Sequence, residues 1–480
     1  MDWERLLSTH KLHDEEAEPE RFRDYPISEF EKDYNKIVSS AAFRRLQDKT
    51  QVFPLDKSDF IRTRLTHSIE VSTTARQLGI MISNNTTQYH HDDITSDISE
   101  GIASVLLCAG LLHDLGNPPF GHFGETVIGD WFKTNLDTIK YKERSLRDWL
   151  STNPQMIKDL EHFEGNAQAL RILLKARHNA EINISSAIIS SLVKYPTTSV
   201  NFDVNSPNLK LHKPGIFLSE YNIFEDISSV LGTVADDGTL NRHPLAYLVE
   251  AADDIAYAIA DLEDAFKKKL FSLDEFVEYF DQSYDHNDIT QRGSPAYYTD
   301  LLLTDLNQRR EAPGSKDSVV FREWLNYTRR WLMYVVIYRF SSSYREIMSG
   351  TYQEDLFHNT NHSISIKSLK GAMKEFVFDS SGILRLELSA QTILSFLLQR
   401  FVNAVLYFDH EDEAHGFVMT KADKKCMSIF SENYKQDYWQ SKTGDEAYDL
   451  YLRLLMVTDY ISGMTDSYAR TLYRELSGIE

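Results

Sequence analysis

Two histidines and two aspartates interrupt segments that are otherwise apolar, and their residue types suit metal chemistry. They are His67, the adjacent pair His113-Asp114, and Asp253. Imidazole nitrogens and carboxylate oxygens together bind borderline and hard divalent metals. A four-ligand set leaves positions for water and a substrate phosphate, so the pattern predicts a hydrolytic metal site. Any one of these residues alone would more often be a hydrogen-bonded core residue, and only their joint occurrence favours the metal.

The segments that carry the histidines are predicted to be helices. Residues 102–112 form an uncharged apolar run that leads directly into His113-Asp114. Another helix is expected over 64–78, with His67 in its first turns and Gly79 near its end. These two helices must bring their histidines together if the metal site exists.

The clearest amphipathic helix is predicted over 244–266, where apolar residues recur at helical spacing. Asp253 interrupts its apolar face, so this carboxylate must be paired or metal-bound. Tyr257 and Asp261 follow at i+4 and i+8 and share a strip with it. The neighbouring Asp254 leaves the identity of the ligand ambiguous, and helical phase favours Asp253.

Composition predicts a protein of a reducing compartment without membrane association. The 480-residue chain has a net charge of −21, which argues against a general nucleic-acid coat protein but permits a phosphate pocket. Two cysteines cannot form a disulfide framework. Charges dominate the first residues, and no run approaches the roughly 18 apolar residues of a membrane span. We therefore expect a cytoplasmic location.

Strand signals are few and short. The second half is predicted to be helical throughout, with dense aromatic residues for packing. No Gly-rich phosphate loop is present, which weighs against nucleotide kinases and dehydrogenases. Residues 89–93 contain two histidines and two aspartates but no apolar frame, so we interpret them as a solvated loop rather than a second metal site.

Six runs, spread over nearly the whole chain, carry a family resemblance. They are Phe43-Arg44-Arg45-Leu46, Thr63-Arg64-Leu65-Thr66-His67-Ser68, His113-Asp114-Leu115-Gly116-Asn117-Pro118-Pro119-Phe120-Gly121-His122, Phe163-Glu164-Gly165-Asn166-Ala167-Gln168, Glu250-Ala251-Ala252-Asp253-Asp254-Ile255-Ala256-Tyr257 and Asp459-Tyr460-Ile461-Ser462-Gly463-Met464-Thr465-Asp466. Together they resemble the HD superfamily of metal phosphohydrolases and, within it, the deoxyguanosine triphosphate triphosphohydrolases (dGTPases). The resemblance implies metal-dependent hydrolysis of dGTP to deoxyguanosine and inorganic tripolyphosphate, by attack of activated water at the alpha phosphorus.

The resemblance also implies an architecture and a set of roles. It implies an all-α fold with an HD-domain helical core over 28–275, after an N-terminal arm over 1–27. The helical region 276–480 would pack on this core and contribute to the substrate pocket and oligomer contacts. The four residues introduced first would hold the metal. Mg²⁺ or Mn²⁺ is expected, and two histidines with two aspartates also admit Fe²⁺ or Co²⁺.

His122 resembles the family's second catalytic histidine, with Glu125 as its partner. Physical reasoning agrees, because the leaving 5′-oxygen needs a proton. A carboxylate three residues further along can orient His122 as the general acid. The alternative is that His122 only caps a structural loop.

Substrate contacts follow from the same resemblance. Near the sugar, the resemblance places Gln51, Tyr257 and Asp261. It implies a triphosphate clamp of Arg64, Lys194, Tyr195 and Lys213. Asn166 is similar to a further substrate contact. Groups that read the 3′-hydroxyl would reject analogues lacking it, and Tyr257 under the ring would crowd a 2′-hydroxyl. Each clamp cation could instead be an ordinary surface charge.

Several alternatives stay open. Within the same class, the chain could be a broad dNTP triphosphohydrolase or one activated by a nucleotide at a second site. From another class come a regulatory single-stranded nucleic-acid-binding HD protein and a cyclic-nucleotide phosphodiesterase. Family relatives suggest a homo-oligomer such as a hexamer, and single-stranded DNA as an effector.

Overall fold

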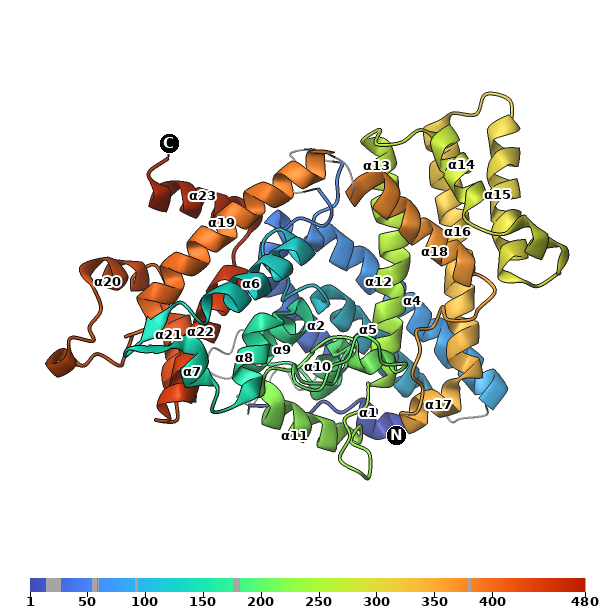
Figure 1. The fold of residues 1–480 in the computed structure, drawn as a ribbon. Coiled ribbons are helices and arrows are strands. Elements are labelled where there is room, and N and C mark those ends of the chain that lie inside the picture. Colours follow the sequence, from blue (N-terminus) through green and yellow to red (C-terminus); the bar gives the residue numbers. More distant parts are fainter. Residues whose placement is uncertain are drawn as a thin grey trace.

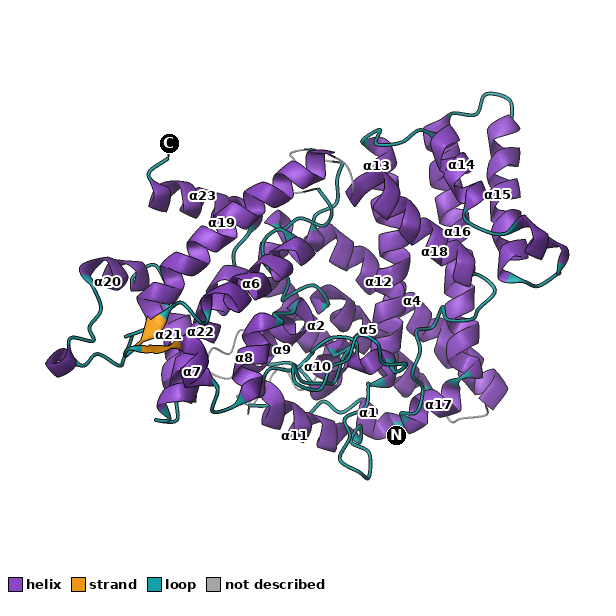
Figure 2. Cartoon of the chain, viewed as in Figure 1, coloured by secondary structure: helices purple, strands orange, loops and turns teal. Residues whose placement is uncertain are grey.

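Helices supply almost all the regular structure of this chain, which confirms the predicted all-α class (Figure 2). A computed structural model describes residues 1–13, 27–53, 58, 60–90, 94–175, 182–378 and 381–479. Within these residues the sheet is a single hairpin of β1 (Lys140–Tyr141) and β2 (Arg144–Ser145), paired antiparallel. No helix in the described ranges is both long and apolar enough to cross a membrane.

The helices of the first half surround the residues singled out above. They are α1 (Trp3–Leu6), α2 (Glu29–Ser39), α3 (Ala41–Arg45), α4 (Arg64–His90), α5 (Ser96–Leu112), α6 (Gly121–Asn135), α7 (Leu146–Leu150), α8 (Pro154–Glu161), α9 (Gly165–Lys175), α10 (Ser186–Leu192), α11 (Tyr221–Leu231) and α12 (Pro244–Ala256). A π-helical turn, Tyr257–Asp261, joins α12 to α13 (Leu262–Lys267).

The second half adds further helices on two sides of this group (Figure 1). They are α14 (Leu273–Gln282), α15 (Pro295–Glu311), α16 (Asp317–Ser342), α17 (Tyr344–Ser349), α18 (Ser363–Met373), α19 (Ser381–Val405), α20 (Lys421–Met427), α21 (Glu432–Ser441), α22 (Glu446–Ser462) and α23 (Asp466–Ser477). A second π-helical turn, Lys374–Phe378, follows α18.

Buried side chains form two hydrophobic cores. One joins α2, α4, α5, α10 and α12 to α14, α15, α16 and α18, and the other joins α6, α7 and α8 to α19 and α22. Each core therefore contains helices from both sides of residue 275. The division into 28–275 and 276–480 remains a proposal, and the later region packs against the earlier one in both cores.

The helices α4 and α5 approach each other closely because glycines lie between them. A Cβ on Gly110 would lie 2.4 Å from the Cα of Ser72, and one on Gly79 would lie 2.6 Å from Cδ1 of Leu106. Gly79 is thus a packing residue inside α4, which continues to His90, and the predicted end near Gly79 was wrong. Residues 84–90 are helical, while residues 91–93 of the predicted loop lie outside the described residues.

The helix α6 begins at Gly121, so His122 lies in its first turn and Glu125 at the start of its second turn. Phe120 and Gly121 both have left-handed backbone conformations, with φ of 65° and 62°. A Cβ on Gly121 would lie 2.6 Å from Nη2 of Arg64, so glycine lets α4 and α6 meet here. This meeting point borders the cavity described next.

Candidate metal centre and adjoining cavity

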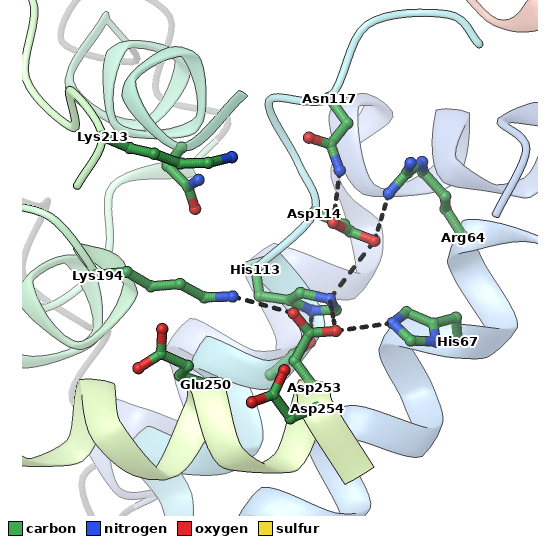
Figure 3. Close-up of polar contacts among 12 residues, drawn as sticks. Arg64, His67, His113, Asp114, Asn117, Lys194, Lys213, Glu250, Asp253 and Asp254 are labelled. Atoms are coloured by element: carbon green, nitrogen blue, oxygen red, sulfur yellow. Dashed lines mark hydrogen bonds and ion pairs between the residues drawn. The ribbon is translucent and has the colours of Figure 1, made fainter. Parts of the chain in front are cut away.

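His67, His113 and Asp253 converge from three helices (Figure 3). Their potential ligand atoms all lie within 4.8 Å of one another. Oδ1 of Asp253 is 3.1 Å from Nε2 of His67 and 3.4 Å from Nε2 of His113. The structure thus brings together residues that are 186 positions apart in the sequence.

The orientation of His113 fits a metal ligand. Its Nδ1 is 2.8 Å from the carbonyl oxygen of Gly110, so Nδ1–H donates to that carbonyl and Nε2 keeps its lone pair. Nε2 is buried and has no hydrogen-bond partner among the described residues. A buried polar atom is rarely left unpaired, and a cation between the two Nε2 atoms and Asp253 would satisfy it.

Asp114 lies beside this group and has partners of its own. Its Oδ2 is 3.5 Å from Nε2 of His113 and accepts from Nη1 of Arg64 at 2.6 Å. Its Oδ1 accepts from Nδ2 of Asn117 at 2.5 Å. Burial alone would raise the pKa of Asp114, but the charge of Arg64 outweighs it and holds the pKa below its usual value. The carboxylate is therefore ionised and lies beside the convergent ligand atoms, but the group within 4.8 Å consists of His67, His113 and Asp253 without Asp114.

The structure separates the two adjacent aspartates of α12. Asp253 faces the histidines, and its Oδ2 accepts from Nζ of Lys194 at 3.0 Å. Burial opposes ionisation of Asp253, but the charge of Lys194 lowers its pKa well below the usual value. Asp254 instead accepts from Nζ of Lys370 at 2.6 Å, and burial raises its pKa to about 6. Of the two, Asp253 is the residue placed to bind a metal.

His122 and Glu125 form a hydrogen-bonded pair on α6. Nδ1 of His122 donates to Oε2 of Glu125 at 2.7 Å, and Oε1 of Glu125 accepts from the amide of Gly165 at 2.9 Å. The His122 side chain is 75% exposed, whereas that of Glu125 is only 8% exposed. The negative charge and hydrogen bond of Glu125 raise the pKa of His122. Burial opposes ionisation of Glu125, but the charge of His122 lowers the pKa of that carboxyl overall.

A cavity of about 480 Å³ adjoins this centre. Seven of the predicted site residues line it: Gln51, Arg64, Asp114, His122, Asp253, Tyr257 and Asp261. Nε2 of Gln51 donates to Oδ2 of Asp261 at 3.3 Å, and burial raises the pKa of Asp261 to about 7. Burial likewise raises the pKa of Tyr257, which lies in the π-helical turn.

The second half of the chain contributes individual wall residues that no sequence motif had marked. Lys370, Phe378, Leu386, Glu387 and Ala390 line the same cavity. Their positions depend on how α18 and α19 pack against the first half, so no local motif marks them. Lys370 pairs there with Asp254, which also lines the cavity.

The predicted cations lie on two sides of the centre rather than in one cluster (Figure 3). Arg64 binds Asp114, and Lys194 binds Asp253 on the other side. Nζ of Lys213 is 3.1 Å from Oε1 of Glu164. Lys213 and His122 also line a second cavity, of about 400 Å³.

The remaining two predicted substrate contacts are close to these lysines. Nδ2 of Asn166 donates to Oε1 of Glu164 at 2.8 Å, so Asn166 and Lys213 share one acceptor. Burial and the charge of Glu250 raise the pKa of Tyr195 to about 12. None of Asn166, Lys194, Tyr195 and Lys213 is among the described residues that line the 480 Å³ cavity.

Comparisons with known proteins identify the family of this chain. The HD domain family matches residues 64–189, which include His67, His113, Asp114 and the His122–Glu125 pair. Deoxyguanosinetriphosphate triphosphohydrolase-like proteins from Listeria monocytogenes and Listeria innocua are each 40% identical over the whole of both chains. The deoxyguanosinetriphosphate triphosphohydrolase of Yersinia enterocolitica is 31% identical over 94% of both chains. The chain therefore belongs to the deoxyguanosinetriphosphate triphosphohydrolase family of HD-domain proteins.

Proposed function

We propose that this protein hydrolyses dGTP to deoxyguanosine and inorganic tripolyphosphate in a metal-dependent reaction. The observation that carries the proposal is the convergence of His67, His113 and Asp253 beside a cavity that His122 also lines. A cavity of about 480 Å³ falls within the range of nucleotide-sized ligand sites. Family membership supports the same reaction class.

The residues that would hold the metal are His67, His113, Asp114 and Asp253. Two imidazoles and two ionised carboxylates suit Mg²⁺, Mn²⁺, Fe²⁺ or Co²⁺, and we propose Mg²⁺ or Mn²⁺. A divalent ion there would lower the pKa of water and offset phosphate charge at the alpha phosphorus. Arg64 and Lys194 neutralise Asp114 and Asp253 from opposite sides and can also bind phosphate oxygens.

We assign proton donation to His122. Cleavage of the bond between the alpha phosphorus and the 5′-oxygen leaves an alkoxide that needs a proton. Glu125 holds Nδ1 of His122 and raises the pKa of the ring, so the ring is held with its proton in place. Lys213 lines the second cavity together with His122. We propose that Lys213, Lys194, Tyr195 and Asn166 hold the departing triphosphate.

Gln51, Asp261 and Tyr257 are proposed to bind the sugar. The Gln51 amide and the Asp261 carboxyl are joined by a hydrogen bond and line the cavity, which suits a pair that reads a 3′-hydroxyl. Tyr257 lies on the same wall, where its ring would disfavour a 2′-hydroxyl. The protein would thereby select deoxynucleotides.

Product analysis tests this function. Purified protein with Mg²⁺ or Mn²⁺ is incubated with each of the four dNTPs singly and with their mixture, and products are separated by ion chromatography. We expect tripolyphosphate and deoxyguanosine from dGTP, and no turnover after chelation. Equal rates on all four substrates would indicate broad specificity, and turnover only in the mixture would indicate a nucleotide activator. Absence of tripolyphosphate in every case would overturn the proposal.

An oligomeric state and an effector are proposed with this function. We propose a homo-oligomer, a hexamer by family resemblance, which light scattering of the full chain would measure. We also propose that single-stranded DNA can act as an effector. A change in dGTP turnover on adding an oligonucleotide, lost at higher salt, would support this, because phosphate contacts weaken with salt.

A further inference from the structure

Asp466 joins two segments that are far from it in sequence and that both border the cavity. Its Oδ1 accepts from the amide of Phe120 at 2.9 Å, and its Oδ2 accepts from the amide of Thr50 at 3.0 Å. The hydroxyl of Thr50 also donates to Oδ2. Only 2% of Asp466 is exposed. We call this arrangement of Asp466, Thr50 and Phe120 the Asp466 clasp.

The clasp is not ordinary capping of a helix. An aspartate at the start of a helix commonly stabilises the N-terminus of that helix. In α23, however, Thr465 is the capping residue, because its side chain accepts from the amide of Tyr468 at 3.2 Å. Both carboxylate oxygens of Asp466 are directed instead at the segments before α4 and α6.

Lys49 binds the same three segments together. Its Nζ donates to the carbonyl oxygens of Asn117 at 2.7 Å and Ser462 at 2.6 Å, and Lys49 is 3% exposed. Segments 49–50, 117–120 and 462–466 are thus connected through two adjacent buried side-chain contacts. Such contacts to two backbones at once restrict their relative movement.

Each anchored residue precedes a residue of the proposed reaction site. Thr50 is followed by Gln51, which binds Asp261. Phe120 lies two residues before His122 and has the left-handed φ of 65°, which is unfavourable for a side-chain-bearing residue. The hydrogen bond from its amide to Asp466 holds the backbone in that conformation at the start of α6.

We propose that Asp466 is a positioning residue for hydrolysis: it fixes the turn that carries His122 against the segment that carries Gln51. The inference rests on the proposed function, because it gives Asp466 the role of aligning the proton donor with a bound sugar. A displacement of about 1 Å of a catalytic group can lower a rate about a hundredfold. No contact of Asp466 with the metal candidates is needed for this role.

The test compares Asp466→Asn with Asp449→Asn in the full-length protein. Asp449 is a matched control because it is 0% exposed, and its two oxygens accept from the amides of Thr443 at 2.8 Å and Gly444 at 3.1 Å. Asp466→Asn should lower kcat for dGTP about tenfold or more with little change in KM, while Asp449→Asn leaves kcat nearly unchanged. Metal content and melting temperature are measured for both variants.

A double-substitution experiment separates positioning from general loosening. The second experiment adds Asp466→Asn to His122→Ala and measures the single-turnover rate of radiolabelled tripolyphosphate release. Asp466→Asn should lower this rate less than about threefold, because no proton donor remains to be aligned. A full tenfold loss in that background, or an equal kcat loss in Asp449→Asn, would overturn the proposal. If Asp466→Asn does not fold, Thr50→Val removes one hydrogen bond of the clasp and should show a smaller loss with the same pattern.

Hydrogen exchange tests the clasp independently of activity. At least one of the amides of Thr50 and Phe120 should exchange about tenfold faster or more in Asp466→Asn than in the unmodified chain, because asparagine keeps only one acceptor oxygen for the two amides. Unchanged exchange would overturn the clasp even if the protein hydrolyses dGTP. Faster exchange in a protein that hydrolyses no dNTP would instead place the failure with the proposed function.

Discussion

Nδ1 of His122 and Oε2 of Glu125 are 2.7 Å apart, and the two groups change each other's protonation. The Glu125 charge raises the pKa of His122, so the imidazolium persists to higher pH than in a free histidine. A proton donor is active only while it is protonated. Activity should therefore fall as pH rises through this raised pKa.

Replacing Glu125 with glutamine should move that alkaline limit to lower pH. The substitution removes the charge that raises the pKa of His122, so the ring loses its proton earlier as pH increases. We expect kcat near pH 7 to fall about tenfold as well. The measurement is the pH profile of kcat for Glu125→Gln beside the unmodified protein. If kcat of Glu125→Gln falls at the same alkaline pH as kcat of the unmodified protein, a group other than His122 controls the alkaline limit.

His113→Ala and His122→Ala should fail in different ways. His113→Ala removes one of the three convergent ligand atoms, so metal content measured by mass spectrometry should drop together with activity. His122→Ala leaves the metal candidates intact and should retain metal while kcat falls about 10²–10⁴-fold. Retained metal in His113→Ala would contradict the proposed ligand set.

The adjacent aspartates of α12 provide a matched pair of substitutions. Asp253→Asn should lose metal, because Asp253 faces both histidines. Asp254→Asn should keep the metal, because Asp254 binds Lys370 instead. Titration with Mn²⁺ measures the affinity of both variants. Asp253→Asn should bind Mn²⁺ about tenfold or more weakly than Asp254→Asn does. The reverse result would exchange their roles.

Recognition of the 3′-hydroxyl can be measured with dideoxynucleotides. The unmodified protein should prefer dGTP to its 2′,3′-dideoxy analogue, and Asp261→Ala should reduce this preference about tenfold or more. The reason is that the hydrogen-bonded Gln51–Asp261 pair would lose the carboxyl that we propose accepts from the hydroxyl. Ratios of kcat/KM for the two substrates give the result. An unchanged ratio would remove Asp261 from sugar recognition.

Helix contact at Gly110 predicts a stability effect. Gly110→Ala would place a Cβ 2.4 Å from backbone of Ser72 and should destabilise the protein by about 2 kcal/mol. Gly101→Ala, on the same helix, would place a Cβ 3.1 Å from the flexible side chain of Leu7 and 3.7 Å from the ring of Phe30, and should change stability by less than about 0.5 kcal/mol. Urea unfolding measures both. Equal stability of the two variants would contradict the close contact of α4 and α5.

Local sequence determined the residue types at the centre and the helices that carry them. The uncharged run before His113 is helical and ends there, and the amphipathic segment beginning at Pro244 is helical as predicted. Helical periodicity and ligand chemistry are properties of short segments, so they could be recognised without the fold. Helical phase also favoured Asp253 over Asp254, and the structure places Asp253 beside the histidines.

Tertiary structure alone decided how these pieces meet. Gly79 looked like a helix end, yet α4 continues past it because that glycine packs against Leu106. The pairing of Asp254 with Lys370 and the contact of Asp466 with Phe120 join residues 116 and 346 positions apart. Such contacts depend on the packing of whole helices, and no local pattern encodes them. The sequence therefore determined which residues could do the chemistry, and the fold decided which residues surround them and hold them in place.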